Sequence, residues 1–325
     1  MSKITKVWLI IAASLVLCGC ILFACLMSTF DWDFTELSSD EYETNTYDIV
    51  EKFDKISMNT NTANIEFSLS DDKKCKVECY ESEDVKHSVS VKDGALTIEM
   101  NDERSVYDFF GNIGFDFDTP KITVYLPKSE YTSLVISEDT GDIGVPENFS
   151  FKDVDINLST GDVMFSASAE NVKIETSTGD ICVEKNLLDS LDLTVTTGEV
   201  TVSDVKCEGD VEVEVSTGKS YLSDVTCKNI ISSGSTGAIS LTNVIAEEKF
   251  SIERSTGAVM FEKSDASSIF VETDTGAVTG SLLSDKVFIT RTDTGSVNVP
   301  ESVEGGKCEI ETDTGDILIT IDKSI

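Results

Sequence analysis

Basic residues are scarce in this chain of 325 residues, which carries 25 Lys and Arg and 1 His against 60 Asp and Glu. The net charge of −35 repels nucleic acid and anionic lipid headgroups within a Debye length. No nucleic-acid partner is therefore expected, whereas cations, basic proteins and neutral glycans remain open as partners. With 40% hydrophobic and 26% charged residues, the composition predicts a folded chain whose acidic surface keeps it soluble.

Residues that carry out catalysis are equally sparse. His87 is the only histidine and has no nucleophile motif nearby, so a surface histidine is favoured over a Ser-His-Asp site. No two cysteines form a CxxC pair, which argues against a zinc site. Sugar-binding surfaces normally carry exposed aromatic residues, but Trp8 and Trp32 lie near the N-terminus, outside the repeats identified below. The sequence predicts a protein without enzymatic activity and without a cofactor.

One long apolar run stands near the N-terminus, from Val7 to Met27, and contains no charged residue. At about 1.5 Å per residue it spans roughly 31 Å, enough to cross a bilayer core. Lys3 and Lys6 precede it, so the positive-inside rule predicts a cytoplasmic tail (1–6), a single transmembrane helix (7–27) and an extracytoplasmic remainder. A cleaved signal peptide is one alternative. Another is a lipoprotein, because the segments ending at Cys20 and Cys25 loosely resemble lipoprotein cleavage sites. Residues 28–47 are acidic and polar and predict a stalk.

A Thr-Gly dipeptide recurs every 18 to 20 residues in the second half of the chain, which identifies an internal repeat. The position two residues after the glycine is a β-branched aliphatic in nine of ten copies, Ser220 being the exception. The position seven residues before the glycine is always apolar. The ten glycines are Gly141, Gly161, Gly179, Gly198, Gly218, Gly237, Gly257, Gly276, Gly295 and Gly315.

Apolar and polar residues alternate on both sides of each Thr-Gly, so two short strands flank each corner. Since one unit returns to the same phase each time, equivalent residues stack in parallel on neighbouring coils. The predicted fold is all-β: a single-stranded β-solenoid of about 19–20 residues per coil, regular over residues 134–325, preceded by one transmembrane α-helix. Ten coils about 4.8 Å apart would extend roughly 48 Å. Cys207 and Cys227, 20 residues apart, are expected to stack and to be buried as small apolar residues.

Residues 48–133 predict an irregular N-terminal part of the same solenoid. Ala63 takes the place of the corner glycine and precedes Gly141 by 78 residues, close to four repeats. An insertion at about 101–119 is rich in aromatic residues, which either cover the core or form a partner-binding or lipid-touching tip. The candidate binding residues are Tyr107, Phe109, Phe110, Phe115 and Phe117.

Asp-Thr-Gly, the aspartic-protease signature, occurs four times, but it alternates with Ser-Thr-Gly in the same repeat slot, so a corner role explains it. Asp274, Asp293 and Asp313 should stack one coil apart, where like charges repel by about 1 kcal/mol even in water. A calcium ion bridging them would relieve this repulsion, although solvated carboxylates are the simpler hypothesis.

Coils that read Ser177-Thr178-Gly179-Asp180-Ile181 or Asp313-Thr314-Gly315-Asp316-Ile317 resemble the bacterial "putative adhesin" family of β-strand repeat proteins, a domain of unknown function. The resemblance covers about residues 50 to 323 and implies a β-solenoid at the bacterial cell surface. We therefore expect a membrane-anchored adhesin or interaction scaffold that binds a cell-wall polymer or a surface protein. The alternatives are an accessory protein in envelope stress signalling and a glycan-active β-helix enzyme. An open solenoid end also predicts end-to-end self-association.

Overall fold

The computed structural model describes residues 3–29, 42–83, 85–102 and 119–323. Most of these described residues are in strands (71%), and the strands follow one described helix. The elements are α1 (Lys3–Thr29), β1 (Tyr42–Ile49), β2 (Lys55–Thr62), β3 (Asn64–Leu69), β4 (Cys75–Ser82), β5 (Val85–Lys92), β6 (Ala95–Asp102), β7 (Lys121–Leu126), β8 (Glu130–Thr140), β9 (Ile143–Val145), β10 (Ser150–Thr160), β11 (Val163–Phe165), β12 (Ser168–Thr178), β13 (Ile181–Leu188), β14 (Ser190–Thr197), β15 (Val200–Cys207), β16 (Asp210–Thr217), β17 (Ser220–Thr236), β18 (Ile239–Thr242), β19 (Ile245–Thr256), β20 (Val259–Thr275), β21 (Val278–Leu282), β22 (Lys286–Thr294), β23 (Val297–Asn298), β24 (Gly306–Thr314) and β25 (Ile317–Ile321).

Helix α1 contains an 18-residue stretch, Trp8–Cys25, with a mean hydropathy of 2.6 and no buried residue. Its polar side chains are satisfied within the helix: Ser14 donates to the carbonyl of Ile10, and Ser28 to that of Cys25. By length and composition the helix could cross a membrane, as the apolar run predicts.

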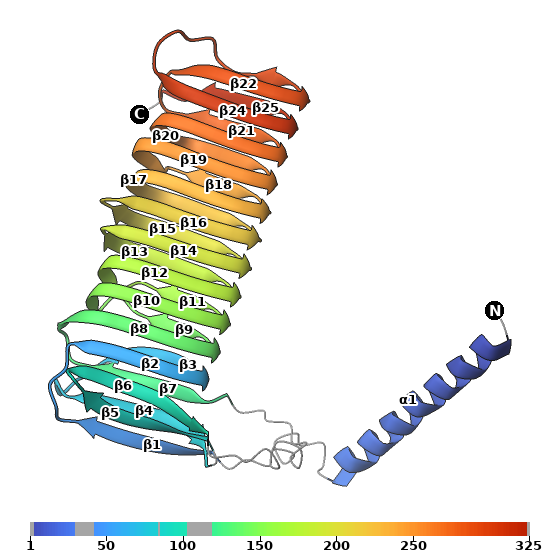
Figure 1. The fold of residues 1–325 in the computed structure, drawn as a ribbon, viewed down its shortest axis with the longest axis vertical. Coiled ribbons are helices and arrows are strands. Elements are labelled where there is room, and N and C mark those ends of the chain that lie inside the picture. The colour runs from blue at the N-terminus through green and yellow to red at the C-terminus, as the bar shows by residue number, and fades with distance from the viewer. Residues whose placement is uncertain (1–2, 30–41, 84, 103–118, 324–325) are drawn as a thin grey trace. The chain divides into compact units, whose positions relative to one another are not determined.

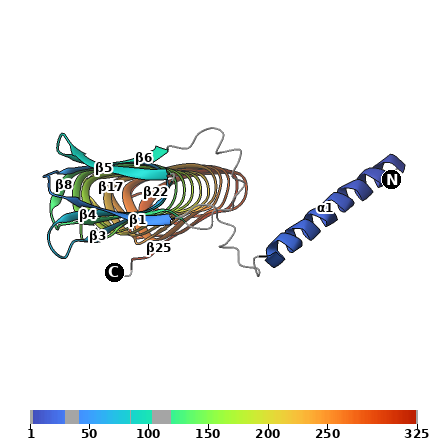
Figure 2. The same ribbon diagram turned by 90° about the horizontal axis from the view of Figure 1, so that it is seen from below.

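The strands form a β-solenoid of about 9 turns, which confirms the predicted fold class (Figure 1). Pairing between coils is parallel and follows the repeat: Thr160 of β10 faces Thr140 of β8 on one side and Thr178 of β12 on the other. Seen from below, successive coils superpose, so equivalent residues form columns along the solenoid (Figure 2).

All ten Thr-Gly corners exclude a Cβ because the adjacent coil is too close, and seven of the ten glycines also have a positive φ. Gly161 has a φ of 137°, in the region that disfavours side chains, and a Cβ there would lie 2.1 Å from the carbonyl oxygen of Gly141 on the adjacent coil. The aspartate that follows the glycine also has a structural role, because Asp162 Oδ1 accepts a hydrogen bond of 2.8 Å from the amide of Asp180. Ser-Thr-Gly-Asp is thus a corner motif in which the carboxylate bonds to the next coil.

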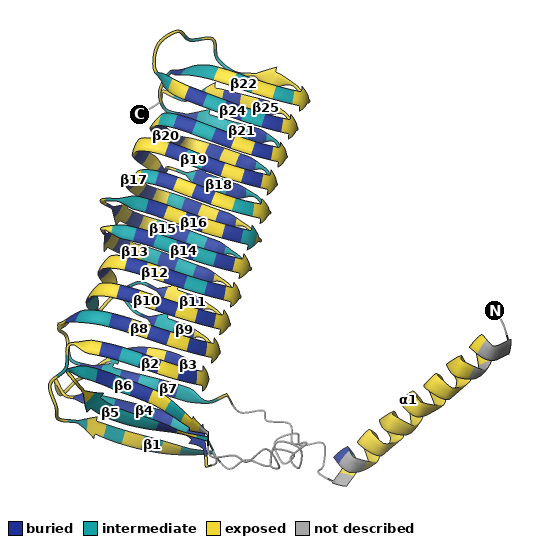
Figure 3. Ribbon diagram, viewed as in Figure 1, coloured by how far each residue is buried: buried dark blue, intermediate teal, exposed yellow. Residues whose placement is uncertain are grey.

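Buried and exposed residues alternate along most strands (Figure 3), and the buried apolar side chains form one continuous core. Ser220, the exception to the aliphatic column, is buried because it accepts a hydrogen bond from the buried guanidinium of Arg254. Arg254 also donates to Ser232 Oγ at 2.7 Å and passes over Gly234, where a Cβ would lie 1.8 Å from Nη1. Burial lowers the pKa of Arg254 to about 10. Ser220, Ser232 and Gly234, which all depart from the repeat, therefore accommodate the buried guanidinium of Arg254.

The N-terminal coils do not stack in chain order. Ala63 occupies the corner-glycine position as predicted, but it lies directly against Gly141, whose added Cβ would be 2.1 Å from the Ala63 carbonyl. The interpretation of the 78-residue spacing as close to four stacked repeats is therefore wrong. Strands β2 and β3 lie between β6 and β7 on one side and β8 and β9 on the other. Strand β4 then pairs antiparallel with β7.

The C-terminal coils are interleaved in a similar way. Strand β24 lies between β20 and β22, and β25 lies between β21 and β23. The expected consecutive stacking of the last coils is therefore wrong. Among the described strands, β22 and β23 form the outermost coil at this end, and the chain returns inward to add its last coil (Figure 1).

A second corner, absent from the sequence interpretation, follows the glycine by six residues in five coils. Lys185, Asp204, Asp224, Asn243 and Lys263 there have φ between 49° and 58°. Aspartate and asparagine tolerate this left-handed conformation better than most residues, which is the signal that could have revealed the corner. The chain turns here into the edge that carries the groove described next.

Candidate binding groove

A groove of about 890 Å³ runs along the solenoid edge that follows the second corner; we call it the edge groove. Its floor consists of inward-facing residues, one per coil, several of them small. Phe151 pairs with Ala169 on the next coil, and Leu188 pairs with Cys207. The residues that line it are Glu130, Ser150, Phe151, Ser168, Ala169, Glu170, Leu187, Leu188, Asp189, Lys206, Cys207, Glu208, Thr226, Cys227, Ile245 and Glu247.

The two walls of the edge groove differ in chemistry. The residue before each floor position forms a largely uncharged wall, in which Leu187 is 66% and Ile245 is 37% exposed. On the other wall, the residues after Ala169, Leu188 and Cys207 are solvent-exposed carboxylates, and the residue after Cys227 is Lys228, which lies 4.0 Å from Glu248. From Ser150 to Ile245 the groove crosses about 24 Å, at about 4.8 Å per coil. The acidic wall comprises Glu170, Asp189, Glu208 and Glu247.

Two cysteines lie in the floor. Cys207 and Cys227 are both free and buried, as the prediction of small apolar core residues requires. Burial raises the pKa of the Cys227 thiol to about 12, and burial together with nearby carboxylates raises that of Cys207. Both thiols stay protonated at neutral pH, so they add apolar surface to the groove and no nucleophile.

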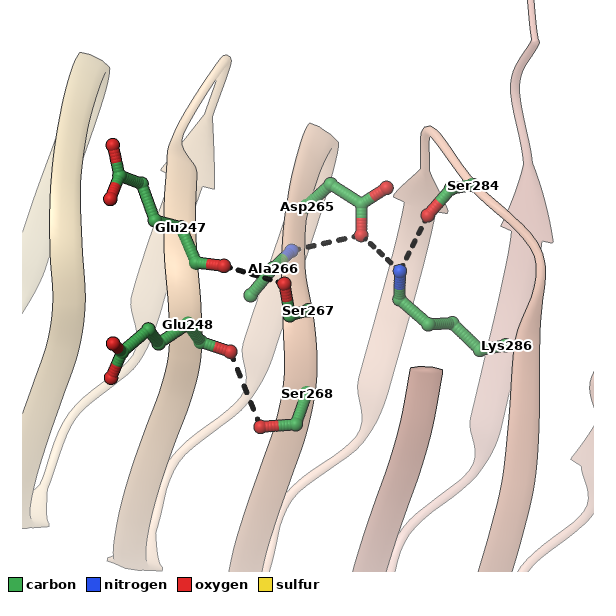
Figure 4. Close-up of polar contacts among 8 residues, drawn as sticks. All are labelled: Glu247, Glu248, Asp265, Ala266, Ser267, Ser268, Ser284 and Lys286. Carbon is green, nitrogen blue, oxygen red and sulfur yellow. Dashed lines mark hydrogen bonds and ion pairs between the residues drawn. The ribbon is translucent and has the colours of Figure 1, made fainter. Parts of the chain in front are cut away.

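The edge continues toward the C-terminus into a second hollow of about 680 Å³, which shares Ile245 with the edge groove. Its wall holds a buried ion pair (Figure 4). Lys286 Nζ lies 2.5 Å from Asp265 Oδ1 and 2.5 Å from Ser284 Oγ, and the amide of Ala266 donates to the same carboxylate oxygen at 2.8 Å. Lys286 lies beside Gly306 of the intervening coil, and an added Cβ on that glycine would be 3.7 Å from the lysine Cδ.

The serine–lysine contact resembles a catalytic dyad, but its electrostatics oppose that role. A lysine that activates serine must be neutral to accept the hydroxyl proton. Here Lys286 forms an ion pair with Asp265 and donates a hydrogen bond to Ser284 Oγ. Four of the five carboxylates that line the edge groove lie on one wall, whereas glycoside hydrolysis needs two that flank the scissile bond. Neither arrangement supports catalysis.

The residues singled out from the sequence fall into three groups. Asp274, Asp313 and Asp293 stack in that order and not in chain order, and all are exposed, with Arg291 lying 3.3 Å from Asp293. His87 is buried, so the surface position predicted for it is wrong. The aromatic candidates Tyr107, Phe109, Phe110, Phe115 and Phe117 lie outside the described residues. The sequence did not predict the edge groove, because its apolar floor continues the ordinary alternation of apolar and polar residues along the strands.

Parallel coils, glycine corners and one apolar helix define the class of this protein as a β-solenoid repeat protein with a candidate N-terminal transmembrane helix. The chain belongs to the Toastrack family DUF4097, which matches residues 53–215. This confirms the resemblance to adhesin-like domains of unknown function that the Thr-Gly coils indicate.

Three solved structures illustrate the similarity. A putative adhesin from Bacteroides fragilis is 16% identical, with 87% of this chain and 98% of that chain covered and a TM-score of 0.36. A putative adhesin from Parabacteroides distasonis is 11% identical, with 85% and 98% covered and a TM-score of 0.39. A putative lipid binding protein from the same species is 12% identical, with 87% and 98% covered and a TM-score of 0.37. No curated protein matches the chain.

Proposed function

We propose that this chain is a membrane-anchored cell-surface protein that binds an elongated partner, a cell-wall polymer or a surface protein, along the side of its solenoid. The observation that carries the proposal is the edge groove, which is open to solvent and runs across successive parallel coils. A repeated groove suits a ligand that is itself extended, because each coil can contribute an equivalent contact. The role is non-catalytic.

Anchoring is proposed through α1, with the N-terminus in the cytoplasm and the solenoid outside. The apolar Trp8–Cys25 stretch and the lysines before it support this topology. Protease treatment of intact cells tests it: the solenoid should be degraded while a tag at the N-terminus survives. Release of the chain into the medium would instead identify a cleaved signal sequence. Labelling by a radioactive fatty acid that disappears in Cys20→Ser or Cys25→Ser would identify a lipoprotein.

The binding role is tested with the full chain in lipid nanodiscs on arrays of glycans, cell-wall fragments and surface proteins. Saturable binding supports an adhesin or scaffold. Turnover of any glycan would identify the enzyme alternative, and silence on every array would favour the signalling alternative. Light scattering of the same sample tests end-to-end association, which we propose for the outer coil of β22 and β23.

A further inference from the structure

We infer that the edge groove binds an extended amphipathic chain in which cationic and apolar side chains alternate, such as a segment of a basic protein. The inference rests on the proposed function and specifies the chemistry of the partner. It follows from three properties of the groove: the charge of one wall, the apolar character of the floor and the other wall, and the direction in which the groove runs.

Charge selects a cationic partner. Glu170, Asp189 and Glu208 follow the floor residues on three successive coils, and Glu247 lies beyond Lys228, whose ammonium group lies 4.0 Å from Glu248. Carboxylates about 4.8 Å apart along a groove focus a negative potential that attracts cations and repels anionic polymers. Lys206, the one basic residue of the lining, lies on the opposite wall. Over these three coils a ligand therefore meets a row of negative charges along one side of the groove.

The apolar wall and floor of the edge groove require apolar side chains on the other side of the ligand. Leu187 and Ile245 are exposed on the less charged wall, and Leu188, Cys207 and Cys227 form the floor beneath them. Burying such exposed side chains against a ligand removes apolar area from water and favours binding. A purely cationic chain would leave this wall uncovered, so the partner needs apolar side chains as well.

The direction of the groove sets the periodicity of the ligand. The groove crosses the strands, so a bound chain runs along the solenoid axis and cannot pair as an additional strand of the coils. An extended peptide places successive side chains on opposite sides and rises about 3.3 Å per residue. About seven residues then cover the 24 Å between Ser150 and Ile245, with cationic residues toward the acidic wall and apolar residues toward Leu187.

Fluorescence polarisation with the full chain in nanodiscs of uncharged lipid tests the inference. The probes are a labelled eight-residue peptide of alternating Lys and Leu and a block peptide of the same composition, four Lys followed by four Leu. We expect the alternating peptide to bind at least 10-fold more tightly. Glu208→Lys should weaken its binding at least 10-fold, while Glu212→Lys, an equal charge change on the exposed face of β16, should change it less than 2-fold.

A second pair of variants tests the apolar contact. Leu187→Ser should weaken binding about 10-fold, whereas Met164→Ser, which alters a side chain of similar exposure (58%) on β11, should not. Equal binding of the two peptides, or equal effects within either pair of variants, would show non-specific attraction and overturn the inference. If arrays identify a partner whose binding Glu208→Lys leaves unchanged, the proposed function stands and only this inference fails. If no array ligand and neither peptide binds, both fail.

Discussion

Glu138 offers the sharpest test of how this solenoid is held together. Its carboxyl group is buried between two coils that are distant in sequence, with Thr60 Oγ1 hydrogen-bonded to Oε2 and the amide of Ala63 donating to Oε1 at 3.1 Å. Burial raises the pKa of Glu138 from 4.5 to about 8, so the folded chain keeps a proton that the unfolded chain releases. The perturbation is Glu138→Gln, which preserves shape and both contacts but removes the titration.

The pKa difference between the folded and unfolded chain sets the sign and size of the change in the free energy of unfolding with pH. A raised carboxyl pKa gives stability that is full below about pH 4.5 and is lost as the pH rises toward 8. Each pH unit in this window costs about 1.4 kcal/mol, so about 3 kcal/mol is lost between pH 4.5 and pH 7. Glu138→Gln does not lose this stability, because the glutamine amide does not titrate. The variant and the natural chain should be equally stable at pH 4, and the variant should be more stable at pH 7 by up to about 3 kcal/mol.

Denaturant unfolding of the full chain in neutral detergent, repeated from pH 4 to pH 8.5, measures this difference. The other carboxylates also titrate, so only the gap between the two curves is informative. Glu214→Gln, a change of the same kind at an exposed position of β16, should give a curve parallel to that of the natural chain. Parallel curves for Glu138→Gln as well would refute the reasoning, because the buried carboxyl would then not be protonated in the fold.

Three further predictions concern other columns of the solenoid. Asp265→Asn leaves the buried Lys286 ammonium without its counter-charge and should lower the free energy of unfolding by about 3–5 kcal/mol, measured by denaturant titration; a loss below 1 kcal/mol would contradict a buried pair. Gly198→Ala forces a Cβ to within 2.0 Å of the adjacent coil's carbonyl at a φ of 148° and should cost about 2–4 kcal/mol. Gly144→Ala, whose Cβ would meet nothing closer than 4.0 Å, is its control and should change the melting temperature little. Calcium should raise the melting temperature of the natural chain and not that of Asp313→Asn, since Asp313 is the middle residue of the acidic column; no shift in either would remove the calcium hypothesis.

The regular part of the fold could be predicted from the sequence because its cause is local. Gly161 and its equivalents recur at a fixed interval, and inward residues such as Val154 and Val163 alternate around them, so corner, strand and parallel stacking all follow from one unit. The edge groove could not be predicted in the same way. Its floor depends on Ala169 and Cys207 being smaller than their neighbours in a column, and columns become visible only when the stacking register is known.

The order in which the coils stack at both ends of the solenoid could not be predicted from the sequence. All corners carry nearly the same motif, so the local sequence allows any coil to stack on any other. What distinguishes the native order is polar contact between particular coils. Glu138 binds Thr60 across 78 residues of chain and Ala63 across 75, and Lys286 reaches Asp265 across the inserted coil that contains Gly306. A coil stacked in the wrong order would bury each of these groups without its partner, at a cost of several kcal/mol. The apolar repeat therefore supplies the stability of the solenoid, and the few buried polar exceptions select which coils meet.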